Sequence, residues 1–358
     1  MNYFKQSPAQ SIIGSSSRFL ASYVLVSLGV LLAAGGGSWD ISNHLLNKPE
    51  TFFAPPHAVL YSGAGAAVVG AIILFLTSRR AGAMIIRPIK LVVAGVIILV
   101  VAGPVDFAWH SAFGLDGLLS PPHFVLVSGM VASSIGSLAG MVYYGSMAFK
   151  ESRLPPLLII IGVLPVWLAV SGIVDMFSLP FSKTDYFNFN PHPTLGVAVA
   201  TLGFPAVISV LACSSSALAG RRFGVMTAVG AAFIVTGMLT SIVPNDALVQ
   251  TLLFYAATNI IPFIAADAVL SFSRSKISLY AAGAIVGLAF FTLYYPLITY
   301  TYGEALGRTT IWPSLIAITY FEIMGTVMPL MVAPAAAMGI LGAAVSAKLV
   351  SKNKALEH

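Results

Sequence analysis

The feature that most constrains the fold of this chain is a succession of long apolar runs separated by short polar segments. Charged residues make up 8% of the 358 residues, whereas a typical soluble domain contains about 25%. A helix of about 20 apolar residues spans the roughly 30 Å hydrocarbon core of a bilayer. Membrane barrels instead require strands of alternating polarity, and the runs here are continuous. We therefore predict an all-α integral membrane protein that contacts the lipid bilayer.

We expect ten transmembrane helices. They lie at about 18–37, 57–78, 90–109, 122–147, 156–176, 193–219, 224–244, 248–271, 278–298 and 313–346. Lysine and arginine are concentrated near both chain ends and in alternate connecting segments, and the opposite segments hold only Lys48, Lys183 and Arg308. The positive-inside rule then places both termini in the cytoplasm, with five hairpins whose tips face outward. The basic residues that give the net charge of +6 lie in the segments expected to face anionic lipid, so we expect no nucleic-acid partner.

This pattern divides the chain into six parts and favours the plasma membrane of a prokaryote. They are a cytoplasmic N-terminal segment (1–17), a first motif-bearing hairpin (18–80), a second (90–147), a degenerate third hairpin (156–219), the remaining helices (224–346) and a cytoplasmic tail (347–358). The tail ends in Leu356-Glu357-His358, which is typical of a cloning remnant, so we exclude His358 from the chemistry.

The first two hairpins carry the same polar motif, 66 positions apart. It consists of Asp40, His44 and His57 in the first hairpin and of Asp106, His110 and His123 in the second. In both hairpins the second histidine directly follows two prolines. Such a repeat indicates parallel internal duplication, which is common in membrane proteins.

The third hairpin repeats the motif only in part. It retains Asp175 and a later histidine, His192, but has Leu179 where the first histidine is expected. We interpret this pair either as a structural relic of the repeat or as a third site.

The residue types and spacing of the motif predict a metal site. An aspartate and a histidine four residues apart lie on one face of a helix, and proline is favoured in the first turn of the next helix. If each hairpin folds back, one carboxylate and two imidazoles converge and leave coordination positions open. Such a set suits copper, iron or zinc, whereas calcium and magnesium prefer more oxygen ligands. The competing interpretation is a polar loop that contacts water.

Several questions remain open at the level of sequence. The two motifs can hold separate ions or one shared dinuclear centre. Glu50 and Asp116 each follow the aspartate of their motif by ten residues. They can bridge metal ions or be solvated loop acids, and we favour the second role.

Glu322 lies within the last apolar run, where a carboxylate marks either a proton or ion path or a neutral structural residue. Asp267 precedes Arg274 and Lys276, and we expect an ion pair there.

The spacing Asp-x3-His-x12-His resembles the copper-binding motif of the C subunit of the particulate methane and ammonia monooxygenases. Asp40, His44 and His57 match this pattern, and so do the three corresponding residues of the second hairpin. The resemblance implies copper ligands at the outer side of the membrane and copper-dependent oxidation of a small substrate. Partner subunits or a homo-oligomer are also consistent with it.

Three other functions fit the same residues. A transporter or metal-handling protein is favoured by the many spans, the parallel repeats and Glu322. A zinc-dependent membrane hydrolase would use a metal-activated water, with Glu50 or Asp116 as the general acid or base. The third of these functions is purely structural, with an ion that holds each hairpin closed. The identity of the metal distinguishes best among these functions.

Overall fold

The computed structural model describes residues 8–45, 51–78, 83–114, 116–149, 153–178, 187–243, 249–289 and 325–355. Within these ranges every regular element is an α-helix. The helices are α1 (Pro8–Leu45), α2 (Pro55–Ser78), α3 (Ala83–Phe113), α4 (Pro121–Phe149), α5 (Pro156–Ser178), α6 (Pro193–Leu218), α7 (Val225–Ile242), α8 (Val249–Phe272), α9 (Lys276–Ala289) and α12 (Gly325–Ala355).

The length and apolar character of these helices confirm the predicted class. Eight of the described helices are long and apolar enough to cross a membrane. The other two, α7 and α9, contain shorter apolar stretches, Val225–Thr240 and Lys276–Ala289. The described part of the chain is therefore all-helical, with the helix lengths and apolar character of a membrane protein. The first part of the last expected span, 313–324, lies outside the described residues.

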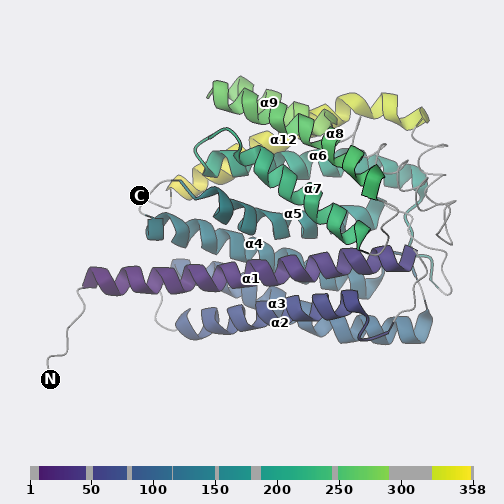
Figure 1. Ribbon diagram of the computed structural model, residues 1–358, viewed down its shortest axis with the longest axis horizontal. Coiled ribbons are helices and arrows are strands. Elements are labelled where there is room, and N and C mark those ends of the chain that lie inside the picture. Colours follow the sequence, from purple (N-terminus) through teal and green to yellow (C-terminus); the bar gives the residue numbers. More distant parts are fainter. Residues whose placement is uncertain are drawn as a thin grey trace.

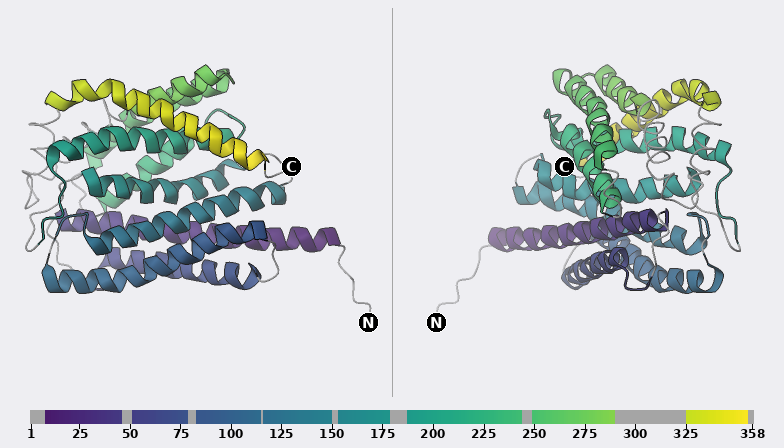
Figure 2. Two further views of the ribbon diagram at one scale, coloured as in Figure 1. Left: turned by 180° about the vertical axis from the view of Figure 1, so that it is seen from behind. Right: turned by 45° about the vertical axis from the view of Figure 1, so that its right-hand side comes forward.

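The helices lie side by side in one bundle (Figures 1 and 2). Helix α1 packs along α2 and also contacts α4, α5 and α7, while α12 packs on α6 and α9. Trp167 of α5 is fully buried at the centre, where it stacks on Phe233 of α7 at a ring-centroid distance of 4.6 Å. Large apolar side chains such as Leu76 and Val101 are 59% and 60% exposed on the outer surface, as expected for a surface in contact with lipid.

Two helix pairs at one side of the bundle cross at glycines. Helix α1 meets α2 where a Cβ atom added to Gly29 would lie 2.6 Å from the carbonyl oxygen of Gly63. Helix α3 meets α4 where a Cβ atom added to Gly129 would lie 2.8 Å from the carbonyl oxygen of Gly95. Residues without a side chain allow the backbones of membrane helices to approach closely, so these positions fix how each pair crosses.

Both polar motifs lie at the same end of the bundle. Helix α1 extends beyond the end expected at 37, so Asp40 lies near its end, and Asp106 lies about two turns before the end of α3 at Phe113. Helices α2 and α4 begin with the Pro-Pro pairs that precede His57 and His123, in agreement with the preference for proline in a first helical turn. The beginning of α1 and the end of α12 lie at the opposite end (Figure 1).

Candidate metal centre

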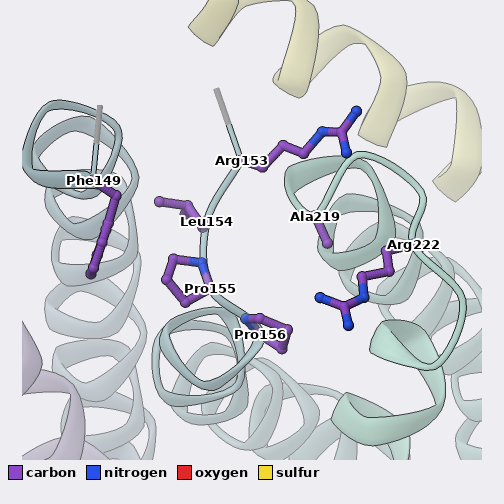
Figure 3. A pocket seen from close by; sticks show the side chains of 7 residues that line it. All are labelled: Phe149, Arg153, Leu154, Pro155, Pro156, Ala219 and Arg222. Carbon is purple, nitrogen blue, oxygen red and sulfur yellow. The ribbon is translucent and has the colours of Figure 1, made fainter. Parts of the chain in front are cut away.

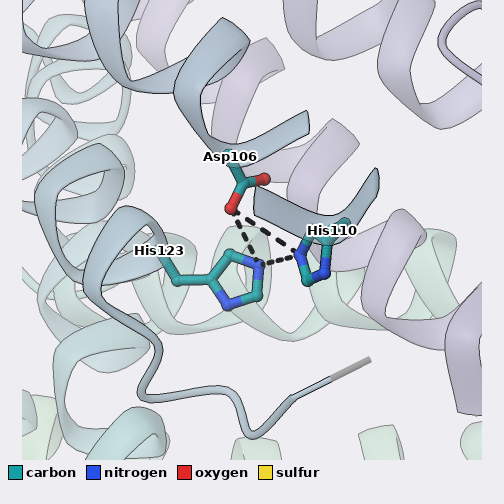
Figure 4. A group of neighbouring side chains, drawn as sticks. All are labelled: Asp106, His110 and His123. Atoms are coloured by element: carbon teal, nitrogen blue, oxygen red, sulfur yellow. Dashed lines mark hydrogen bonds and ion pairs between the residues drawn. The ribbon is translucent and has the colours of Figure 1, made fainter. Parts of the chain in front are cut away.

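The second motif forms a compact triad between the end of α3 and the beginning of α4. The ligand atoms of Asp106, His110 and His123 all lie within 4.8 Å of one another. Asp106 Oδ1 is 3.7 Å from His110 Nε2 and 3.3 Å from His123 Nε2. The two Nε2 atoms are 3.1 Å apart. Figure 4 shows the three side chains pointing toward one another.

Backbone carbonyl groups fix the orientation of both imidazole rings. His110 Nδ1 lies 3.2 Å from the carbonyl oxygen of Gly114, and His123 Nδ1 lies 3.2 Å from that of Leu118. A carbonyl oxygen can only accept a hydrogen bond, so each Nδ1 must carry the proton that it donates. Each neutral ring therefore presents the lone pair of Nε2 to the centre of the triad. This is the usual outer-shell arrangement around metal-binding histidines.

Three acceptors that face one another at such distances repel one another unless a positive charge lies among them. Asp106 Oδ1 is buried and accepts no hydrogen bond from a described residue. A tetrahedral ion with bonds of about 2.0–2.1 Å separates its nitrogen ligands by about 3.4 Å, which is close to the spacings of this triad. A proton on one imidazole would also relieve the repulsion. The donor set and geometry thus fit a transition-metal ion.

The first motif forms a looser group at the end of α1 and the beginning of α2. Asp40 Oδ1 is 3.2 Å from His57 Nε2, and Asp40 Oδ2 is 3.8 Å from His44 Nε2. His57 Nδ1 lies 2.9 Å from the carbonyl oxygen of Thr51, so this ring is oriented in the same way as those of the second motif. The three residues do not meet, as a set, the 4.8 Å limit that the second triad meets.

The two motifs are neighbours in space. The rings of His44 and His110 approach edge to face, with centroids 6.4 Å apart. The connection after α1 also reaches α3, where Phe52 contacts Phe107 at a ring-centroid distance of 4.9 Å. Two sets of candidate ligands thus lie near each other at one end of the bundle.

Asp116 differs from the solvated acid that the sequence suggested. It is 2% exposed, and its Oδ2 accepts a hydrogen bond of 2.6 Å from Trp109 Nε1. Trp109 directly precedes His110, and Asp116 lies between Gly114 and Leu118, whose carbonyl groups orient the two rings. The bond therefore connects α3 to this segment. Sequence reasoning missed the contribution of Trp109, for which the only available signal was an acidic residue seven positions after it.

The remaining candidate ligands are not assembled with the triads. Asp175 is half-buried near the end of α5, whereas His192 is exposed and precedes the first turn of α6. The set of described residues that is close enough to hold one ion includes neither of them. Glu50 and Glu322 lie outside the described residues.

The expectation for Asp267 was wrong. It is fully buried, and its Oδ2 accepts hydrogen bonds from the backbone N–H groups of Gly224 and Thr227 and from the Thr227 hydroxyl. Asp267 therefore caps the beginning of α7 and forms no ion pair with Arg274 or Lys276 among the described contacts. A carboxylate at this position is stabilised by the free N–H groups and the dipole of the helix.

The chain matches no family model, no curated protein and no solved structure. The fold and the site therefore define its class directly. It is a helical membrane protein with an Asp/His/His group that is able to hold a metal ion.

Proposed function

We propose that this protein is a membrane metalloprotein that binds copper through Asp106, His110 and His123 and a second ion through the first motif. The proposal rests on the convergence of three ligand atoms while two backbone carbonyl groups hold both rings with Nε2 toward the ion. Iron and zinc accept the same donors, so the preference for copper comes from the resemblance to the monooxygenase C subunits.

The two sites belong to a proposed duplication of one helix pair. Gly29 and Gly63, where α1 crosses α2, precede Gly95 and Gly129 of the α3–α4 crossing by 66 positions each. Further along the pairs, a Cβ atom on Gly70 would lie 3.0 Å from the carbonyl oxygen of Ser22, and one on Gly136 would lie 2.9 Å from that of Pro88. These positions also differ by 66. The same packing at the same register supports parallel repeats.

The proximity of the repeats favours a pair of neighbouring ions over two isolated ones. The 6.4 Å between the ring centroids of His44 and His110 brings the two ligand sets to one place. When bound, copper would supply redox chemistry at this place. The protein surrounds the site with aromatic side chains, because Phe52 contacts both Tyr61 and Phe107. Such surroundings suit a small apolar or weakly polar substrate.

The proposed orientation places both sites outside the cytoplasmic membrane. They lie at the end of the bundle away from the beginning of α1 and the end of α12 (Figure 1), and the basic connecting segments belong to that other end. Electrons for an oxidation would come from a partner subunit or from a soluble donor on the outer side.

Metal analysis of purified protein without a histidine tag tests this proposal. We expect about two copper ions per chain after removal of weakly bound metal, and about one in His44→Ala and in His123→Ala, because each substitution removes one of three ligands. His192→Ala is the matched control, since His192 is exposed and lies outside both motifs. Unchanged copper in His123→Ala would refute the site.

The kind of metal and its spectrum distinguish the competing functions. Zinc in place of copper would exclude the proposed oxidation and favour the hydrolase or the structural site. In the copper(II) protein, electron paramagnetic resonance reports whether the ions interact. A spectrum of coupled ions that becomes that of an isolated ion in His44→Ala would support neighbouring sites, and isolated ions in the unmodified protein would contradict them.

A further inference from the structure

A cavity of about 310 Å³ lies at the opposite end of the bundle, where α4 ends, α5 begins and α6 connects to α7. Phe149, Leu154, Pro155 and Pro156 provide an apolar wall, and Arg153 and Arg222 provide two positive charges. In Figure 3 the two arginines lie near Ala219, and Phe149 lies across the cavity from them. A mixed lining of this kind suits a ligand that has an anionic group and an apolar part.

The charges of the two arginines are not balanced by a described carboxylate. The described acidic residue at this end is Asp267, which is fully buried and caps α7. Arg221 is directed elsewhere, because its Nη1 donates to the carbonyl oxygen of Ser273. Arg153 and Arg222 are both exposed. They are thus available to an anion that enters the cavity.

The surroundings of the cavity are typical of the depth of lipid headgroups. Phe149, in the cavity wall, is 47% exposed, and Leu157 and Phe223, next to cavity residues in the chain, are 68% and 57% exposed. Apolar side chains exposed next to arginines are typical of the membrane interface. Guanidinium groups bind phosphate oxygens through paired, charge-assisted hydrogen bonds.

We propose that this cavity binds the phosphate group of an anionic phospholipid. Arg153 and Arg222 would hold the phosphate, and the acyl chains would follow Phe149 and Leu157 along the surface of the bundle. The ligand is an anionic lipid and not a free phosphate, because the cavity opens beside exposed apolar side chains. Such a site would couple the inner ends of α4, α5 and α6 to the composition of the surrounding leaflet.

Titration of the purified full-length protein with phosphatidylglycerol, followed by native mass spectrometry, tests the proposal. We expect the double variant Arg153→Gln/Arg222→Gln to bind this lipid about tenfold more weakly, because it loses the charge-assisted bonds to phosphate. Arg274→Gln is the matched control, since Arg274 is an exposed arginine outside the cavity lining. We expect its affinity to change by less than about twofold.

Two further measurements distinguish an anionic lipid from a lipid without net charge and from free phosphate. Equal affinity for phosphatidylcholine would overturn the preference for an anionic lipid. Displacement of bound phosphatidylglycerol by millimolar inorganic phosphate would identify a soluble anion as the ligand and would also overturn the proposal. Unchanged affinity in the double variant would remove the two arginines from the site.

A pair of glycine variants tests the site while both arginines keep their charge. Gly220 and Gly224 both have positive φ angles, +69° and +94°, so alanine strains the backbone at both positions. A Cβ atom at Gly220 would lie 2.6 Å from Arg153 Nε, whereas one at Gly224 would have no atom within 4 Å. We expect Gly220→Ala to weaken lipid binding and Gly224→Ala to leave it unchanged. Equal effects would contradict the role of Arg153.

Discussion

At the scale of single residues, the candidate centre depends on backbone groups more than on neighbouring side chains. His57, His110 and His123 each direct Nδ1 to a carbonyl oxygen in the segment that follows α1 or α3. Those carbonyl groups keep Nε2 directed to the candidate centre as long as the segments keep their conformation. Residues that hold these segments therefore influence the centre without touching an ion, and Asp116 is the clearest case.

Trp109→Phe should loosen the second triad while leaving its ligands in place. The substitution removes the hydrogen bond to the buried carboxylate of Asp116, and a bond to a charged group contributes about 1.5–3 kcal/mol to stability. We expect the free energy of unfolding to fall by about that amount. We expect metal affinity to fall about tenfold, as is typical when outer-shell partners are lost.

Trp39→Phe is the matched control for this change. Trp39 directly precedes Asp40 on α1, as Trp109 directly precedes His110 on α3. Its side chain forms no hydrogen bond with another described residue. Chemical denaturation and competition with a chelator measure the two quantities. If Trp109→Phe behaved like Trp39→Phe, Asp116 would have no positioning role.

At the scale of elements, each motif is held by a pair of helices that cross at glycines. The ligands come from the end of one helix and the beginning of the next, so their separation depends on the angle and the distance of the crossing. In membranes, small residues and close backbone contact, in place of water exclusion, drive such association. The crossing of α3 and α4 thus controls how closely His110 approaches His123.

Gly129→Ala should weaken the α3–α4 pair. The added Cβ atom would lie 2.7 Å from the backbone nitrogen of Leu99 and 2.8 Å from the carbonyl oxygen of Gly95, so the helices must separate. Overpacking of this kind costs about 1–3 kcal/mol. Gly103→Ala, on α3 of the same helix pair, is the control because its Cβ atom would have no neighbour within 4 Å. Thermal unfolding in detergent measures the stability of both variants. Equal stability would contradict the close crossing of α3 and α4.

At the scale of the whole molecule, the two ends of the bundle differ in chemistry. One end carries two Asp/His/His motifs with aromatic side chains nearby, and the other carries a cavity lined by arginines and apolar side chains. Helices of this length separate the two ends by the thickness of a membrane. The proposed metal chemistry and the proposed lipid site would therefore operate on opposite sides.

Cysteine labelling in intact cells tests this orientation. The single native cysteine, Cys213, is 1% exposed and should give little background. Phe53, at the metal end, and Phe272, at the end of α8 near the arginines, are 78% and 91% exposed. We expect a membrane-impermeant maleimide to label Phe53→Cys in intact cells and Phe272→Cys only after the membrane is opened. The reverse pattern would place the candidate metal centre in the cytoplasm.

Much of the fold and part of the site could be predicted from local pattern. The length of the apolar runs determined that the chain is helical and crosses a membrane, because the hydrocarbon core requires helices of a minimum length. The spacing of Asp106 and His110 placed both on one helix face, and the Pro-Pro pair placed His123 at the start of α4. These relations extend over only a few helical turns, so a single sequence contains them.

Only the tertiary structure decided which distant groups meet. It placed His44 beside His110, buried Asp116 against Trp109 and turned Asp267 to the beginning of α7. The sequence left the first relation open and favoured a solvated loop acid at Asp116. It suggested an ion pair for Asp267, because adjacent charges look like natural partners on a linear chain. The position of one helix against another depends instead on the summed packing of many side chains, and no short stretch of sequence encodes that sum.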